Sequence, residues 1–190
     1  MKRYHYKSYR EYCNTQRAGY EKKMDRVWTQ AKHIKIIAGL LGPVSLGLCH
    51  GVRTGKEVEW FRKYTGARVI GSEIGKTSLP DIVQWDFNRV RGGWVSKFDF
   101  VYSNSFDHAY NLPATLSVWF EQLRPGGVML LEHGHGHEKL SKLDPVAIKR
   151  WQLKRIMRKC GLRNVREVVL HKFEDDTKRH RVVIIGEKPA

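Results

Sequence analysis

Short apolar runs alternate with segments of helical periodicity through the middle of the chain. Such runs, bounded by glycine, proline or polar residues, are typical of buried strands. They predict strands at Val44–Leu48, Ala67–Gly71, Ile82–Phe87, Lys97–Ser103 and Val128–Leu131. Helices are expected between them, at Lys56–Tyr64 and Leu112–Leu123. Strands that alternate with helices predict an α/β fold with a largely parallel sheet.

The two ends of the chain continue this pattern. Apolar residues at helical spacing predict an amphipathic helix at Lys23–Leu41, packed before the first strand, and Tyr6–Tyr20 is expected to form a second helix or a lid. Pro145 favours the first turn of a helix at Asp144–Cys160. Two strands should follow, at Val165–Phe173 and His180–Ile185, joined by the polar turn Glu174–Lys178.

A glycine-rich turn, LGLCHGVRTG, follows the first of the central strands, and the next strand ends in Glu73. In doubly wound folds such a turn lets the backbone approach a ligand, and such an acid binds the hydroxyls of an adenosine ribose. The chain contains neither the dinucleotide pattern G-x-G-x-x-G nor the phosphate-binding pattern G-x-x-x-x-G-K-[ST]. The turn therefore favours a cofactor with ribose and adenine but no phosphate; an ordinary turn that binds nothing is the alternative.

Two later segments fit the same kind of ligand. Asp86 stands between Trp85 and Phe87, so its carboxylate can accept the adenine amino hydrogens while an aromatic ring packs on the base. The apolar strand at 97–103 then leads into the polar sequence Ser103-Asn104-Ser105.

In this order, the segments resemble the class I S-adenosylmethionine (SAM)-dependent methyltransferases, which have a Rossmann-like fold. The pieces that carry the resemblance are CHGVRTG, VIGSEI, WDF, FDFVYSNS and LRPGGVMLLE, within residues 42–137. The resemblance implies a doubly wound, seven-stranded mixed sheet flanked by helices, with the last strand pair antiparallel. Residues 1–40 would be a basic helical extension packed on a methyltransferase domain of residues 41–190. The chain departs from the family pattern at two points. Ser45 stands near the place of an acid, and Cys49-His50 interrupts what is usually a denser cluster of glycines.

The resemblance also implies that SAM is the cofactor and that the activity is methyl transfer. The residues that it assigns to cofactor binding are Gly47, Cys49, His50, Gly51, Glu73, Ile74, Trp85, Asp86, Phe87, Ser103 and Asn104.

Catalytic side chains are expected beyond the carboxyl ends of the fourth and fifth strands. Asp107, His108 and His133 lie there, and each can position the acceptor or remove its proton. His108 is the first choice because histidine ordinarily titrates near neutrality; a turn residue without a catalytic role is the alternative. Members of this family that methylate exocyclic base nitrogens usually have the motif [DN]-P-P-[YF] after the fourth strand. This chain lacks the motif, which counts against that kind of acceptor.

The segment EHGHGHE, after the fifth strand, places His133, His135 and His137 at alternate positions. In an extended backbone these side chains would face one side, as metal ligands can. Because the glycines make this segment flexible and a catalytic metal usually needs a ligand from another element, we predict no metal, and a substrate-facing or surface loop instead.

Positive charge is concentrated at the two ends of the chain. Residues 1–40 carry a net charge of +7 and residues 139–190 one of +9, whereas residues 41–138 are neutral. An excess of this kind favours an acidic partner, and RNA or another polyanion is the first candidate. A small-molecule or sugar O- or N-methyltransferase is the first alternative, and a nucleic-acid-binding protein of this fold without catalysis is the second.

Length and composition fit one enzyme domain of 190 residues. The three cysteines include no Cys-x-x-Cys pair, which favours a reducing compartment, and we expect a cytoplasmic protein. No apolar run approaches the roughly 18 residues of a membrane span.

Overall fold

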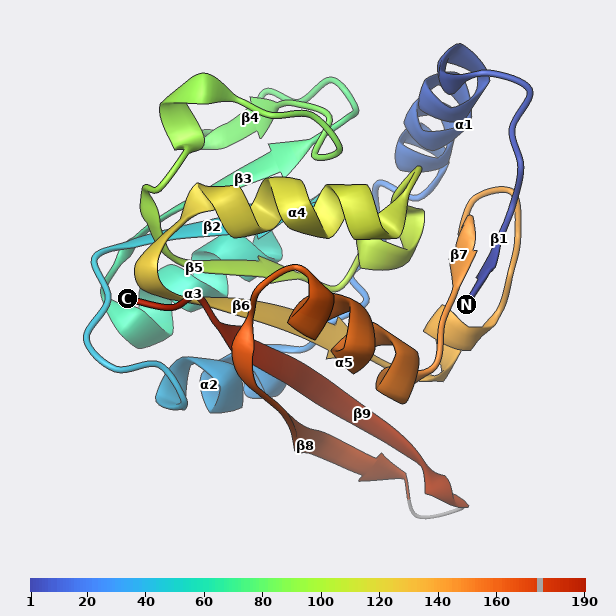
Figure 1. The fold of residues 1–190 in the computed structure, drawn as a ribbon. Helices are drawn as coiled ribbons and strands as arrows, with labels where there is room; N and C mark the ends of the chain where they lie inside the picture. The colour runs from blue at the N-terminus through green and yellow to red at the C-terminus, as the bar shows by residue number, and fades with distance from the viewer. Residues whose placement is uncertain (174–175) are drawn as a thin grey trace.

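The structure, a computed structural model, describes the backbone of residues 1–173 and 176–190 and the side chains of residues 1–171 and 180–190. Its main feature is a seven-stranded sheet in the order β4-β3-β2-β5-β6-β9-β8 (Figure 1). The strands are β2 (Leu46–His50), β3 (Arg68–Glu73), β4 (Ile82–Gln84), β5 (Phe98–Ser103), β6 (Leu123–His133), β8 (Arg163–Phe173) and β9 (Asp176–Glu187). β9 runs antiparallel to both of its neighbours, β6 and β8, and the other pairs are parallel, which confirms the predicted mixed sheet with a terminal antiparallel pair.

Helices cover both faces of the sheet (Figure 1). α4 (Leu112–Gln122) and α5 (Arg150–Lys159) pack on one face, where Trp119 is fully buried. α2 (Ala31–Gly39) and α3 (Lys56–Thr65) pack on the other, where Phe61 is fully buried. Among the described residues, no helix has both the length and the apolar character of a membrane span.

Two predicted helices begin later than expected. The helix expected from Lys23 begins at Ala31, since Lys23 ends the preceding helix. The helix expected from Asp144 begins at Arg150, because Val146–Ala147 form the short strand β7, which pairs with β1 (Lys2–Arg3). Pro145 is therefore not in a first helical turn. The predicted turn Glu174–Lys178 includes two residues, 174 and 175, that lie outside those described.

The N-terminal helix α1 (Tyr9–Lys22) lies beyond the carboxyl ends of β2 and β3, away from the sheet faces (Figure 1). The hydroxyl of Ser8 caps it by accepting a hydrogen bond from the backbone N–H of Glu11 at 3.1 Å. At its other end the ring of Tyr20 packs directly on Gly75, where a Cβ would lie 2.1 Å from a ring carbon. α1 is thus the predicted second helix, and its position is that of a lid.

Candidate active site

A pocket lies between α1 and the carboxyl ends of the parallel strands, and we call it the main pocket. On its sheet side, five residues predicted to bind the cofactor line it: Gly51, Glu73, Ile74, Asp86 and Phe87. On its other side it is lined by the α1 residues Tyr12, Gln16, Gly19 and Tyr20.

Gly51 brings the backbone to the floor of this pocket. Its φ of 71° is in the left-handed region that favours glycine. A Cβ at this position would lie 2.7 Å from the Cβ of Ser105. Any side chain would therefore be both strained and in collision, which fits the predicted close approach of a ligand to this turn.

The carboxylate of Glu73 is fixed at the wall of the pocket. One oxygen accepts a hydrogen bond from the backbone N–H of Arg53 at 2.9 Å, and the other accepts one from that of Ile74 at 2.8 Å. The oxygen bonded to Ile74 also accepts a long hydrogen bond from the backbone N–H of Gly75 at 3.5 Å, so the lone pair that remains for a ribose hydroxyl is on the oxygen bonded to Arg53. The side chain is 7% exposed and lines the pocket, as a ribose-binding acid must.

Asp86 is bonded from both sides. Its Oδ1 accepts hydrogen bonds from the backbone and the side-chain amide of Asn88, at 3.0 and 2.7 Å. Its Oδ2 accepts the hydroxyl hydrogen of Tyr9, on α1, at 2.5 Å. Burial, and then this bond, raise the pKa of the Tyr9 hydroxyl, so it remains a donor. α1 is therefore fastened to one of the two acids predicted to recognise the cofactor.

Other bonds from α1 complete the cover. The hydroxyl of Tyr20 donates to the carbonyl of Lys76 at 3.0 Å, and that of Tyr12 donates to the carbonyl of His108 at 2.9 Å. The space that remains in the main pocket is about 40 Å³, which is room for only a few water molecules. A nucleoside therefore enters only if α1 or the side chains that line the pocket move.

The structure places three of the predicted cofactor residues in the sheet rather than at the pocket. Gly47 is the second residue of β2, where a Cβ would lie 2.1 Å from the ring of Phe100, so it allows close packing. Cys49 is fully buried on the α2 and α3 side of the sheet, and burial raises the pKa of its thiol. The side chain of His50 points to the opposite face.

His50 is part of the core beneath α4. Its ring stacks on Trp119 at a centroid distance of 4.6 Å, and its two nitrogens lie 2.7 Å from the hydroxyl of Ser72 and 2.8 Å from the side-chain oxygen of Gln122. Burial lowers the pKa of His50 to about 4. The imidazole is therefore a neutral core group that does not line the main pocket.

The other predicted cofactor residues are divided between several places. Trp85 is outside the main pocket, where its indole N–H donates to the carbonyl of Arg89 at 3.0 Å, so Phe87 is the aromatic ring that faces the pocket. Ser103 is fully buried, and its hydroxyl donates to the carbonyl of His50 at 3.0 Å. Asn104 lines a second cavity instead.

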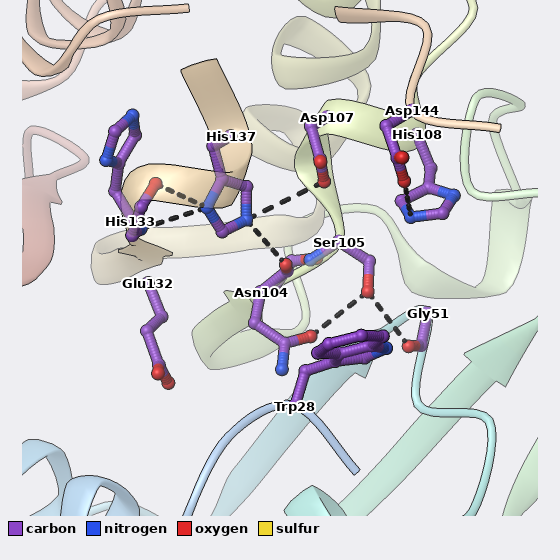
Figure 2. Close-up of polar contacts among 12 residues, drawn as sticks. Trp28, Gly51, Asn104, Ser105, Asp107, His108, Glu132, His133, His137 and Asp144 are labelled. Atoms are coloured by element: carbon purple, nitrogen blue, oxygen red, sulfur yellow. Dashed lines mark hydrogen bonds and ion pairs between the residues drawn. The ribbon is translucent and has the colours of Figure 1, made fainter. Parts of the chain in front are cut away.

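This second cavity, which we call the side chamber, has a volume of about 190 Å³. It shares Lys23, Ser105 and His108 with the main pocket. Figure 2 shows the indole of Trp28 beside Ser105 and Asn104, with Asp107 and the pair His108 and Asp144 farther along. The remaining wall residues are Gly136, His137 and Arg181. The arrangement thus joins a covered pocket to a polar chamber through a short common wall.

His108 lies at this junction and is held from two sides. Its Nδ1 is 2.8 Å from the side-chain oxygen of Gln16, on α1. Its Nε2 is 3.3 Å from a carboxylate oxygen of Asp144. Asp107, its neighbour on the short helix η2 (Phe106–His108), also faces the chamber, so the structure brings together two of the three predicted catalytic residues.

His133, the third predicted catalytic residue, does not reach either cavity. Its Nε2 lies 2.8 Å from the carbonyl oxygen of Ile148, and its ring stacks on Phe106. Burial lowers the pKa of His133 to about 4. His137 lines the chamber in its place, because residues 135–138 form the short helix η3 and not the extended backbone that three histidines on one side would need.

Glu132 explains why Trp28 lies at the chamber. This fully buried carboxylate accepts hydrogen bonds from the hydroxyls of Thr29 and Tyr102, each at 2.6 Å, and from Arg181 at 3.0 Å. Burial acts to raise its pKa, but hydrogen bonds from His33, Thr29 and Tyr102 outweigh burial and hold the pKa below its usual value. The result anchors the segment before α2 to the end of β6.

No protein-family model matches the sequence, and neither does any curated protein. Solved structures do match. A Burkholderia thailandensis 1,6-didemethyltoxoflavin-N1-methyltransferase, crystallised with 1,6-didemethyltoxoflavin and S-adenosylhomocysteine, has a TM-score of 0.74 at 16% identity, over 98% of this chain and 93% of that one. A chain from a complex that contains the Haloferax volcanii Trm112 methyltransferase activator has a TM-score of 0.67 at 17% identity, over 95% and 98% of the two chains.

A third match limits what the fold says about chemistry. The 4+2 cyclase SpnF has a TM-score of 0.64 at 13% identity, over 84% of this chain and 81% of that one. A fold that hosts a cyclase as well as methyltransferases does not decide the reaction, which must be argued from the site. What the strand order and these matches do show is that the chain has the Rossmann-like fold of the class I SAM-dependent methyltransferases.

Proposed function

We propose that this protein transfers a methyl group from SAM to a nitrogen or oxygen of a small-molecule acceptor held in the side chamber. The observation that carries the proposal is the common wall of the two cavities, formed by Lys23, Ser105 and His108. A methyl donor in one cavity and an acceptor in the other would meet at this wall. The acceptor-bound match from Burkholderia thailandensis supports the same kind of substrate.

The residues of the main pocket fit SAM. Glu73 would bind the ribose hydroxyls, Asp86 the adenine amino group, and Phe87 the face of the base. Gly51 leaves room for the methionine part beside the turn. When bound, SAM supplies an electrophilic methyl group, so the protein has to align the acceptor and exclude water.

The chain's own contribution lies at the junction. Asp107 and His108 would hold the acceptor's N–H or O–H group and direct its lone pair toward the main pocket. Trp28 closes the chamber opposite them and would pack on a planar acceptor. Because α1 covers the main pocket, it would keep bulk water from the sulfonium during transfer.

The proposal is tested first by isothermal titration calorimetry with SAM and S-adenosylhomocysteine. We expect each to bind at one site per chain, and ATP and NAD⁺, which carry phosphates, to bind far more weakly. Transfer of a labelled methyl group to fractionated metabolite pools would then identify the acceptor. Absence of SAM binding by the folded protein would remove the proposed function.

RNA is a second candidate acceptor or partner, favoured by the net charges of +7 and +9 at the two ends of the chain. If these segments bind RNA, the affinity should fall with salt, with a log–log slope of about 0.7 per phosphate contact on a single strand. Replacing the exposed residues Arg10 and Arg17 by glutamate should reduce that slope. Filter binding at several salt concentrations measures it. Equal methylation of RNA by this double variant and the wild type would remove α1 as an RNA contact.

A further inference from the structure

We propose that Asp107, His108 and Asp144 bind one divalent cation at the edge of the side chamber. One ligand atom from each of the three residues lies within 4.8 Å of those of the other two. Two ligands on opposite sides of an ion, with bonds of about 2.1 Å, are about 4.2 Å apart. Small side-chain rotations would therefore bring all three groups onto one ion. Figure 2 shows the Asp107 carboxylate on one side and the His108–Asp144 pair on the other.

The hydrogen-bond network fixes which nitrogen of His108 is free to bind a metal. The side-chain amide of Gln16 donates to the carbonyl of Leu143 at 3.1 Å and to the hydroxyl of Tyr6 at 3.3 Å. Its oxygen is thereby turned toward His108 Nδ1, 2.8 Å away, so Nδ1 must carry the hydrogen of that bond. In the neutral ring, Nε2 then has an unshared electron pair directed at the chamber.

That electron pair faces a carboxylate. Asp144 Oδ1 is 3.3 Å from His108 Nε2, while Asp144 Oδ2 accepts a hydrogen bond from the hydroxyl of Ser141 at 2.8 Å. Two atoms that both carry unshared pairs repel each other unless a proton or a metal ion lies between them. A metal ion placed between these two atoms would bind both of them.

Asp107 supplies a second, independent observation. Its carboxylate is 7% exposed and, among the described residues, accepts no hydrogen bond. The nearest basic group, His137 Nε2, is 3.7 Å away and donates its hydrogen to the carbonyl of Asn104 instead. His137 Nδ1 lies 2.9 Å from the backbone nitrogen of Gly134 and 3.1 Å from its carbonyl oxygen, so both ring nitrogens are occupied by backbone groups. This carboxylate lines the chamber without a protein donor, so its oxygens are available to a cation.

The other cationic side chains that line the chamber do not neutralise these carboxylates. In the described part of the chain, neither Lys23 nor Arg181 forms an ion pair with Asp107 or Asp144, and Arg181 pairs with Glu132 at 3.0 Å. The cluster therefore combines two carboxylates and one imidazole nitrogen without a positive partner of its own. Mixed carboxylate and imidazole ligands suit Mn²⁺ or Zn²⁺, whereas Ca²⁺ prefers sites made of oxygen ligands alone. Three protein ligands leave positions open for water and for a substrate atom.

The cation gives the side chamber a chemical preference, and this step rests on the proposed function. An acceptor hydroxyl bound to the ion would have a lowered pKa and would release its proton to water. The resulting oxygen lone pair would form the new bond to the methyl carbon as the carbon–sulfur bond breaks and its electrons stay on sulfur. A hydroxyl next to a second oxygen, able to chelate the ion, is the acceptor class that this site would favour.

Binding of the metal alone is the test. After treatment with a chelator and dialysis, the protein is titrated with MnCl₂ by calorimetry and by electron paramagnetic resonance, without SAM. We expect one Mn²⁺ per chain, with a nitrogen coupling from one imidazole. Asp107→Asn and Asp144→Asn should each weaken binding at least 10- to 100-fold, the loss known for outer-sphere partners alone. His108→Asn should remove the nitrogen coupling.

The matched control is His135→Asn, because His135 is exposed and outside the cluster. This variant should bind Mn²⁺ as the wild type does, and thermal unfolding would verify that every variant folds. The proposal is overturned if the wild type binds no Mn²⁺ or Zn²⁺, if the two aspartate variants bind normally, or if His135→Asn abolishes binding. Metal binding without SAM binding would overturn the proposed function and leave the metal site intact. SAM binding without metal binding would overturn the metal site and leave the proposed function intact.

Discussion

Replacing Glu73 by alanine is expected to weaken SAM binding by about 1.5–3 kcal/mol, the range for losing hydrogen bonds to a charged group. That free energy corresponds to a roughly 10- to 150-fold rise in Kd. The physical reason is the loss of the carboxylate at the pocket wall. Calorimetry with SAM measures the change directly.

A second variant separates binding from structure, because alanine also leaves the backbone N–H groups of Arg53 and Ile74 without their acceptor. Glu73→Gln keeps one side-chain oxygen for them and should still bind SAM more weakly than the wild type. Glu59→Ala is the control, since Glu59 is an exposed acid of α3 that pairs with Lys56 on the same helix. Unchanged SAM affinity in folded Glu73→Ala would contradict the ribose assignment.

Replacing His108 by alanine is expected to lower turnover by roughly 10²-fold or more, the scale of a group that acts on the acceptor's proton or position. The variant loses the only side chain of η2 that lines both cavities. Single-turnover methyl transfer to the acceptor identified in the metabolite screen measures the rate, and SAM affinity should change little.

The control for this variant is His5→Ala, because His5 is exposed and lines neither cavity. Asp107→Asn should lower turnover in the same direction as His108→Ala. If both variants transferred the methyl group at the wild-type rate, the chemistry would lie outside this junction, and the side chamber would lose its role.

The sequence indicated which residues line the main pocket where this depends on position along a strand. Glu73 is the last residue of β3, Asp86 and Phe87 come shortly after β4, and the carboxyl ends of parallel strands meet at one edge of the sheet. Cys49 and His50 also end a strand, yet successive side chains of a strand point to opposite faces. Because helices cover both faces here, both side chains are buried.

The remainder depends on contacts between distant segments, for which local patterns give no signal. Gln16 lies more than ninety residues before His108, and it reaches it only because α1 crosses the end of the sheet. The place of Asp144 in the chamber was not predicted, because Pro145 indicated the start of a helix there. Instead, the carbonyl of Pro145 accepts a hydrogen bond from the backbone N–H of Tyr4. Trp28 lies at the chamber because its neighbour Thr29 is bonded to Glu132, more than a hundred residues away, which no local pattern predicts.

The bond between Gln16 and His108 has a kinetic consequence. α1 covers the main pocket, so a nucleoside can pass only when α1 or its side chains withdraw, and Gln16 is one of those side chains. Each exchange of spent cofactor for fresh would then release His108 Nδ1 and free the ring to turn. The junction would be reassembled once per catalytic cycle, after the donor has arrived. An acceptor would therefore find its site complete only on the donor-loaded protein, an ordered sequence in which the acceptor binds second.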